Sequence, residues 1–231
     1  MQPANPGVQH NRDWVGAGAG FLFVVLTVIS DGTGGNHPFS TGPIEPIRSL
    51  FLSNPGPFAI QAANYVESVA TLLLVVFGAS LARCLWLGAQ QILAVAAFGG
   101  VVLAAGINLI QSALLSVLAF SVVSDGDIGA IKALYALRHI LLAYIYFPLA
   151  LVAIAIAIGT LVSGVFPRWY GWLTAVVGVA FLSGGADVAT SGFFMSQGDH
   201  WFYVLILFAL WVLLTSGLLL RRTKSRLRSR G

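Results

Sequence analysis

The chain has 231 residues, of which 58% are hydrophobic and only 9% are charged, and its formal net charge is +4. Soluble domains carry about 25% charged residues, so this composition excludes a soluble globular protein. Six apolar stretches fill the chain and no long polar block separates them. We therefore expect a single integral membrane domain over residues 1–231, an all-α bundle of transmembrane helices.

Six transmembrane helices are predicted by runs of about 20 apolar residues, the length that crosses roughly 30 Å of hydrocarbon. They lie near residues 14–30, 58–84, 91–122, 138–163, 169–191 and 201–220. Between the first two is a Gly- and Pro-rich loop, 31–57, in which only "IRSLFL" can form a short interfacial turn. The alternative for the first span is a signal peptide cleaved near Ser30, but "TVISDG" lacks a small-x-small cleavage pattern, so we expect the span to be retained.

Lys and Arg are concentrated on alternate flanks of the predicted helices, and cytoplasmic flanks carry an excess of these residues. The basic flanks contain Arg12, Arg83, Arg168 and the tail 221–231. The intervening flanks contain Asp31, Glu45, Asp125, Asp127 and Asp199, with only Arg48 and Lys132 as positive charges. This pattern predicts an N-in/C-in topology with loop 31–57 outside, in a multi-pass protein of the plasma membrane.

Two short patterns imitate binding motifs. The "GAGAGF" stretch resembles a dinucleotide fingerprint, but that fingerprint requires a preceding strand, and the spacing of Gly16 and Gly20 predicts a face for close helix packing instead. The basic tail 221–231 could bind nucleic acid or anionic lipid, and its position after the last span favours a topology anchor on anionic lipid, with no nucleic acid partner. Cys84 is the only cysteine, so no disulfide can form within the chain.

Polar residues recur every three or four positions inside the second and third spans, which places them on one face of each helix. The second span contributes Gln61, Asn64, Glu67, Ser68 and Thr71, and the third contributes Asn108, Gln111, Ser112 and Ser116. The fourth and fifth spans add Tyr135, Arg138, His139, Tyr146, Ser183 and Asp187. Counted from the inner helix ends at 1.5 Å per residue, Glu67, Asn108 and Asp187 lie about 24 to 28 Å up, in the outer third of the membrane.

We therefore predict a polar cluster in the outer-leaflet half, with Asn64, Glu67, Asn108, Gln111, Arg138, His139 and Asp187 as binding residues. A carboxylate in hydrocarbon is costly unless it is paired, and Arg138 is the cation that can reach either carboxylate from the head of its helix. In the alternative, Arg138 extends to the outer headgroups, or the cluster only locks the register of the helices. No second histidine within the spans faces His139, and we expect neither a metal nor a cofactor.

Two segments carry a resemblance to a known family. They are "GVFPRWYGWLTAVVGVAFL" and the earlier "FLSNPGPFAIQAANYVESVATLLLVVFGASLARCL". The chain is similar over most of residues 50–222 to a widespread, uncharacterised family of bacterial six-span integral membrane proteins, in which a Pro-Arg-Trp-x-Gly-Trp turn links spans four and five. The resemblance implies a six-span fold and its topology. It implies no activity and no ligand.

Two classes of function fit these observations. The first is a binding, sensing or accessory module whose polar pocket accepts a lipid or small apolar molecule from the outer leaflet. The second is a small intramembrane enzyme, in which Glu67 or Asp187 acts as a general acid on a lipid or isoprenoid substrate while Arg138 holds an anionic headgroup. The sequence shows no recognisable nucleophile or cofactor motif, which favours the binding module. The oligomeric state is left open.

Overall fold

The computed structural model describes residues 6–34, 38, 42–52, 56–123, 126–185 and 199–228. Every regular element in these ranges is a helix. The elements are α1 (Pro6–Gly34), α2 (Ile44–Leu52), α3 (Gly56–Leu87), α4 (Gln91–Val117), the π-helical turn η1 (Leu118–Val122), α6 (Ile128–Tyr144), α7 (Tyr146–Ser163), α8 (Arg168–Gly184) and α9 (Asp199–Arg228).

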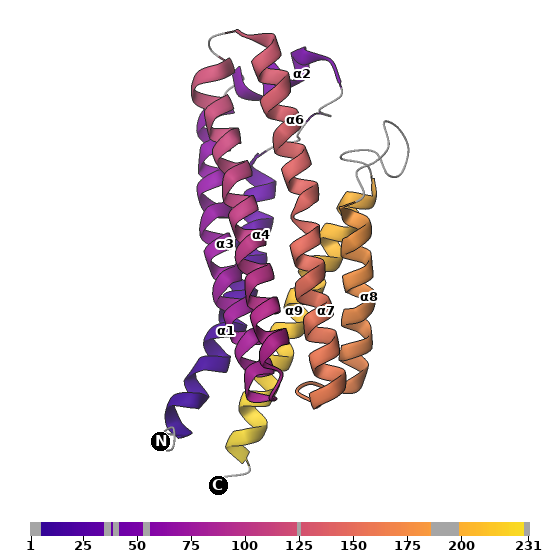
Figure 1. Ribbon diagram of the computed structural model, residues 1–231. Coiled ribbons are helices and arrows are strands. Elements are labelled where there is room, and N and C mark those ends of the chain that lie inside the picture. The colour runs from indigo at the N-terminus through magenta and orange to yellow at the C-terminus, as the bar shows by residue number, and fades with distance from the viewer. Residues whose placement is uncertain are drawn as a thin grey trace.

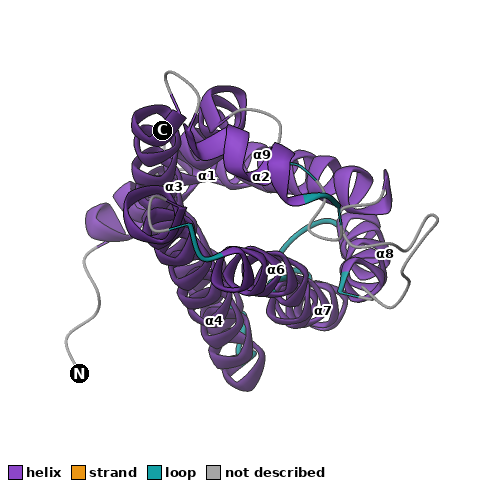
Figure 2. Cartoon of the chain, turned by 90° about the horizontal axis from the view of Figure 1, so that it is seen from above, coloured by secondary structure: helices purple, strands orange, loops and turns teal. Residues whose placement is uncertain are grey.

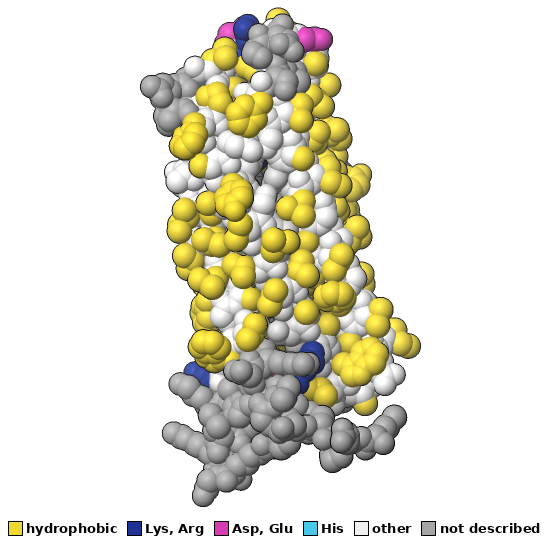
Figure 3. Space-filling view, turned by 90° about the vertical axis from the view of Figure 1, so that its left-hand side faces the viewer, with side chains coloured by type: hydrophobic (Ala, Val, Ile, Leu, Met, Phe, Trp, Pro, Cys, Tyr) yellow, Lys and Arg dark blue, Asp and Glu magenta, His cyan; other side chains and the backbone are white. Residues whose placement is uncertain are grey.

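Five helices are long and apolar enough to cross a membrane. They cover Asp13–Thr33, Gly56–Leu87, Gln91–Phe120, Ile128–Ser163 and Phe202–Arg222. Helix α8 is shorter, with 17 residues. On the face drawn in Figure 3, a wide apolar band covers the middle of the molecule and the charged side chains lie beyond it, towards the two ends. The fold is thus a helix bundle with the dimensions and surface of a membrane protein.

The long helices form a closed ring. Helix α1 packs on α3, α3 on α4, α4 on α7, α7 on α8, α8 on α9, and α9 returns to α1. Figure 1 shows these helices running lengthwise with α2 lying across one end, and Figure 2 shows the ring from above. The start of α1 and the end of α9 lie at the other end of the bundle, away from α2 (Figure 1).

The fourth lengthwise helix differs from its predicted bounds. It begins at Ile128 rather than Arg138, and α6 and α7 follow each other directly, with only Ile145 between them. The start is stabilised by Asp127, whose Oδ1 accepts a hydrogen bond from the Ala130 amide at 3.0 Å, as an N-cap does. Arg138 and His139 therefore lie well inside a helix and not at its N-terminal end.

Parts of the predicted Gly- and Pro-rich loop, 31–57, are helical. Helix α1 continues through Asp31 to Gly34, and the stretch predicted as an interfacial turn lies within α2, whose Ile44, Ile47 and Phe51 are buried. A helix of this length is marginal in isolation, so burial of the apolar face of α2 is what stabilises it.

Glycines in α1 allow the close packing that their spacing predicts. A Cβ at Gly16 would overlap Ser80 of α3, and one at Gly20 would overlap Ser216 of α9 and approach Phe77 of α3 to 2.8 Å. The interpretation of this stretch as a packing face is confirmed, because both glycines touch neighbouring helices where any side chain would clash.

Candidate functional site

Two separate apolar clusters fill the bundle, and polar residues lie between them. In α3 the larger cluster extends up to Ala70 and the smaller one, beneath α2, begins at Ile60. In α4 the corresponding limits are Ala104 and Leu115. We call the polar residues in this interval and at its edge the polar layer: Asn64, Glu67 and Thr71 of α3, Asn108, Gln111 and Ser112 of α4, and Arg138 and His139 of α6.

Helices α3 and α4 are joined across the polar layer by side-chain hydrogen bonds. Gln111 Nε2 donates to Glu67 Oε1 at 3.3 Å and to Asn108 Oδ1 at 3.1 Å. Asn108 Nδ2 donates to Thr71 Oγ1 at 2.7 Å. One turn higher, Asn64 Nδ2 donates to the Ser112 carbonyl at 3.1 Å. The predicted stripes on the second and third spans therefore face each other.

Helix α6 contributes a buried Arg–His pair. Arg138 is 6% exposed and His139 is 4% exposed. His139 Nδ1 lies 2.7 Å from the Tyr135 carbonyl, and its Nε2 lies 3.4 Å from Arg138 Nη1. A carbonyl and a guanidinium fix the tautomer, because the first only accepts and the second only donates. His139 is therefore a neutral imidazole that donates from Nδ1 and accepts from Arg138 at Nε2.

Arg138 forms no ion pair with any carboxylate of the described residues, whereas Arg83 pairs with Asp13 at 3.3 Å. The predicted direct pairing of Arg138 with Glu67 is therefore not formed. The alternative, in which Arg138 extends to the headgroups, does not fit its burial either. Arg138 is thus a buried guanidinium that no described carboxylate contacts.

Two polar atoms of the polar layer have no hydrogen-bond partner. They are Arg138 Nε, a donor, and Gln111 Oε1, an acceptor. Gln111 is 0% exposed, and all three contacts of its Nε2 are to acceptor oxygens, which fixes the orientation of the amide. A buried polar group without a partner costs about 1–3 kcal/mol, and more when it is charged, so both atoms carry a cost that the described protein groups do not offset.

Most of these residues lie on the shared faces that the sequence predicts. Asn64, Glu67, Asn108 and Gln111 form one network with Ser112. Arg138 and His139 lie between Tyr135 of the smaller cluster and Tyr146 of the larger one. Asp187 falls outside the described residues. The sequence places Asp31 in a Gly-rich loop, whereas the structure continues α1 through it.

A contact chain connects α2 to the Arg–His pair, and it too was missed. The rings of Phe51 and Tyr135 meet edge to face with centroids 6.4 Å apart, and the rings of Tyr135 and His139 lie 4.5 Å apart. The Tyr135 hydroxyl donates to the Pro38 carbonyl at 3.0 Å. Helix α2 thus covers the end of the polar layer that lies towards it.

Among the described residues, no three His, Cys, Asp or Glu side chains gather closely enough to hold a metal ion. The arrangement offers other chemistry: a guanidinium that can donate to an anion, a carboxylate that can accept from a donor, and amide groups between them. Comparison of the chain with protein families, with curated proteins and with solved structures finds no match. The family resemblance of the sequence therefore stays a prediction.

Proposed function

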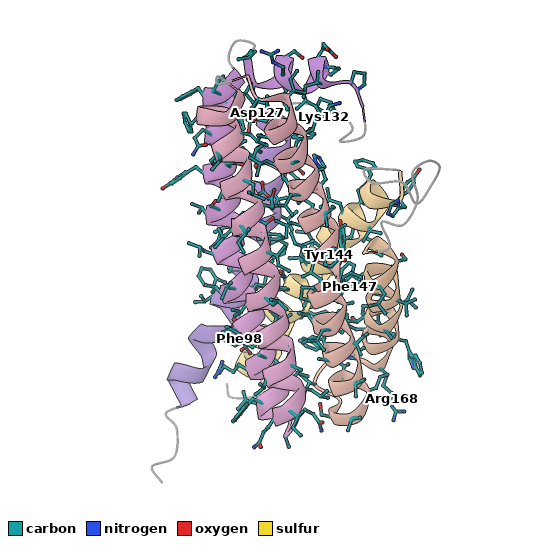
Figure 4. All side chains as sticks on the ribbon, turned by 45° about the horizontal axis from the view of Figure 1, so that its top comes forward. Phe98, Asp127, Lys132, Tyr144, Phe147 and Arg168 are labelled. Atoms are coloured by element: carbon teal, nitrogen blue, oxygen red, sulfur yellow. The ribbon has the colours of Figure 1, made fainter. Side chains whose placement is uncertain are left out.

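We propose that the chain is a six-span protein of the plasma membrane with both termini in the cytoplasm. Helix α8 is the sixth span, because it closes the ring between α7 and α9. The ends of the bundle differ in charge in the sense of the positive-inside rule. Asp127 lies near one end, together with Lys132, and Arg168 lies near the other (Figure 4). The end that carries Arg168, Arg83 and the tail is the cytoplasmic one.

We further propose that the protein is a binding, sensing or accessory module whose polar layer accepts a lipid or a small apolar molecule with a polar group. The observation that carries this proposal is Arg138, a guanidinium with 6% exposure and an unpartnered Nε. A charge inside a membrane bundle is costly to bury, and no described carboxylate contacts it. A ligand that supplies an acceptor at Arg138 removes this cost.

Native mass spectrometry tests the proposal. Wild-type protein extracted in a mild detergent is expected to retain a bound lipid or small molecule, and Arg138→Gln is expected to lose it. The matched control is Lys132→Gln, which removes an exposed cation from the same helix and is expected to retain the bound species. Wild-type protein without any retained species, or an Arg138→Gln variant that keeps it, would refute the proposal.

A further inference from the structure

The two unpartnered atoms of the polar layer are of opposite type. Arg138 Nε needs an acceptor, and Gln111 Oε1 needs a donor. A purely anionic group would satisfy the first and leave the second unpaired. An ammonium alone would do the reverse. A hydroxyl, which both donates and accepts, satisfies both atoms but carries no charge. A ligand that satisfies both atoms carries an acceptor and a donor in one polar group.

The polar layer also contains ionisable groups of both charge types. The layer holds a carboxylate, Glu67, and a guanidinium, Arg138, and these two groups form no ion pair with each other. Each therefore keeps hydrogen-bonding capacity. Glu67 Oε1 accepts from Gln111, and its side chain is only half-buried, so a headgroup can reach it from the surface of the bundle.

We propose that the ligand of the polar layer is a zwitterionic amphiphile whose anionic group binds Arg138 and whose primary ammonium binds Glu67 and Gln111 Oε1. This assignment rests on the proposed function above. The ligand's two charges oppose those of Arg138 and Glu67, so binding adds no net charge to the interior of the bundle. A phosphoethanolamine headgroup has this chemistry, with three N–H donors on the ammonium and acceptor oxygens on the phosphodiester.

The choice of lipids separates charge from hydrogen bonding. Phosphatidylglycerol has the phosphodiester but no ammonium. Phosphatidylcholine has the positive charge, but its methylated nitrogen has no N–H donor. The test therefore titrates delipidated wild-type protein in detergent with dioleoyl phosphatidylethanolamine, phosphatidylglycerol and phosphatidylcholine, and measures the dissociation constants by native mass spectrometry. Glycerophosphoethanolamine, which has no acyl chains, tests whether the free headgroup is enough.

Phosphatidylethanolamine is expected to bind about tenfold or more tightly than the other two lipids, because phosphatidylglycerol offers neutral hydroxyl donors in place of the charged ammonium and phosphatidylcholine offers no N–H donor. Glu67→Gln is expected to lower its affinity to that of phosphatidylglycerol, and Arg138→Gln to weaken all three. Glu45→Gln, at an exposed position on α2, is the control and is expected to leave the ranking unchanged. Circular dichroism confirms that each variant is folded, and Arg138→Lys, which keeps the charge, replaces Arg138→Gln if that variant unfolds.

The outcomes separate the two proposals. Equal affinity for the three lipids, or a preference that survives Glu67→Gln, would overturn the zwitterionic assignment while the binding function stands. No binding of any lipid, together with no species retained by the wild type, would overturn both. Competition by glycerophosphoethanolamine would support the headgroup chemistry with a soluble source, and binding of the lipid alone would support it with the membrane as the source.

Discussion

Replacing Gln111 by leucine tests whether the polar layer joins α3 to α4. The substitution keeps a side chain of similar size at a fully buried position. It removes the Nε2 donor to Glu67 Oε1, Asn108 Oδ1 and Ser112 Oγ, and it also removes the unpartnered Oε1, so only a double-mutant cycle isolates the Glu67 contact. A hydrogen bond to a charged group contributes about 1.5–3 kcal/mol in soluble proteins, whereas interhelical bonds in a membrane protein average about 0.6 and reach about 1.7 kcal/mol. The 3.3 Å separation is slightly beyond the range of about 2.7–3.2 Å that is normal for N–H···O hydrogen bonds, so we expect a loss of about 1 kcal/mol from this contact.

The free energy of unfolding is measured in mixed micelles by titration with a denaturing detergent, with circular dichroism as the signal. Gln61→Leu is the matched control on α3, because the Oε1 of Gln61 is buried without a partner and its removal is expected to cost little. A double-mutant cycle of Gln111→Leu with Glu67→Ala isolates the contact. We expect a coupling of about 1 kcal/mol, and strict additivity would refute the interhelical bond.

Two other predictions concern topology and packing. In a Cys84→Ser background, a cysteine at Ser40 is expected to react with an impermeant maleimide in intact cells and one at Ser225 only after lysis; labelling of the second in intact cells would reverse the proposed orientation. Gly20→Leu is expected to destabilise the protein by about 1–3 kcal/mol through overpacking, whereas Gly18→Leu, where a Cβ meets nothing within 4 Å, is expected to be nearly neutral in the same unfolding assay. Equal effects at the two glycines would contradict the packing of α1.

The helical class and the facing polar stripes could be predicted from the sequence because both follow from periodicity. Apolar runs fix which segments are long enough to cross a membrane, and a three-to-four-residue spacing fixes that Asn64 and Glu67 share one face. Glu67 and Gln111 then meet because the short connection between their helices makes them antiparallel neighbours. Local pattern was sufficient for these features.

The position of Arg138 could not be predicted in the same way. In the sequence, the last charged residue before the apolar run is Arg138, which was predicted to begin the fourth span. In the structure, the capping hydrogen bond of Asp127 starts the helix at Ile128. The placement of Asp31 within a helix depends on α1 continuing through Gly32 and Gly34, and glycine is unfavourable inside helices. Whether Arg138 contacts Glu67 depends on distances between helices, which no spacing within one helix determines.

Arg138 is proposed to bind a ligand within the bundle. An experimental structure of the protein in lipid nanodiscs that contain phosphatidylethanolamine tests this binding most directly. Non-protein density is expected about 3 Å from Arg138 Nε, at hydrogen-bonding distance, continuous with an acyl chain at the surface of the bundle. A direct Arg138–Glu67 ion pair, with no such density, would contradict ligand binding and reduce the polar layer to a structural connection between helices.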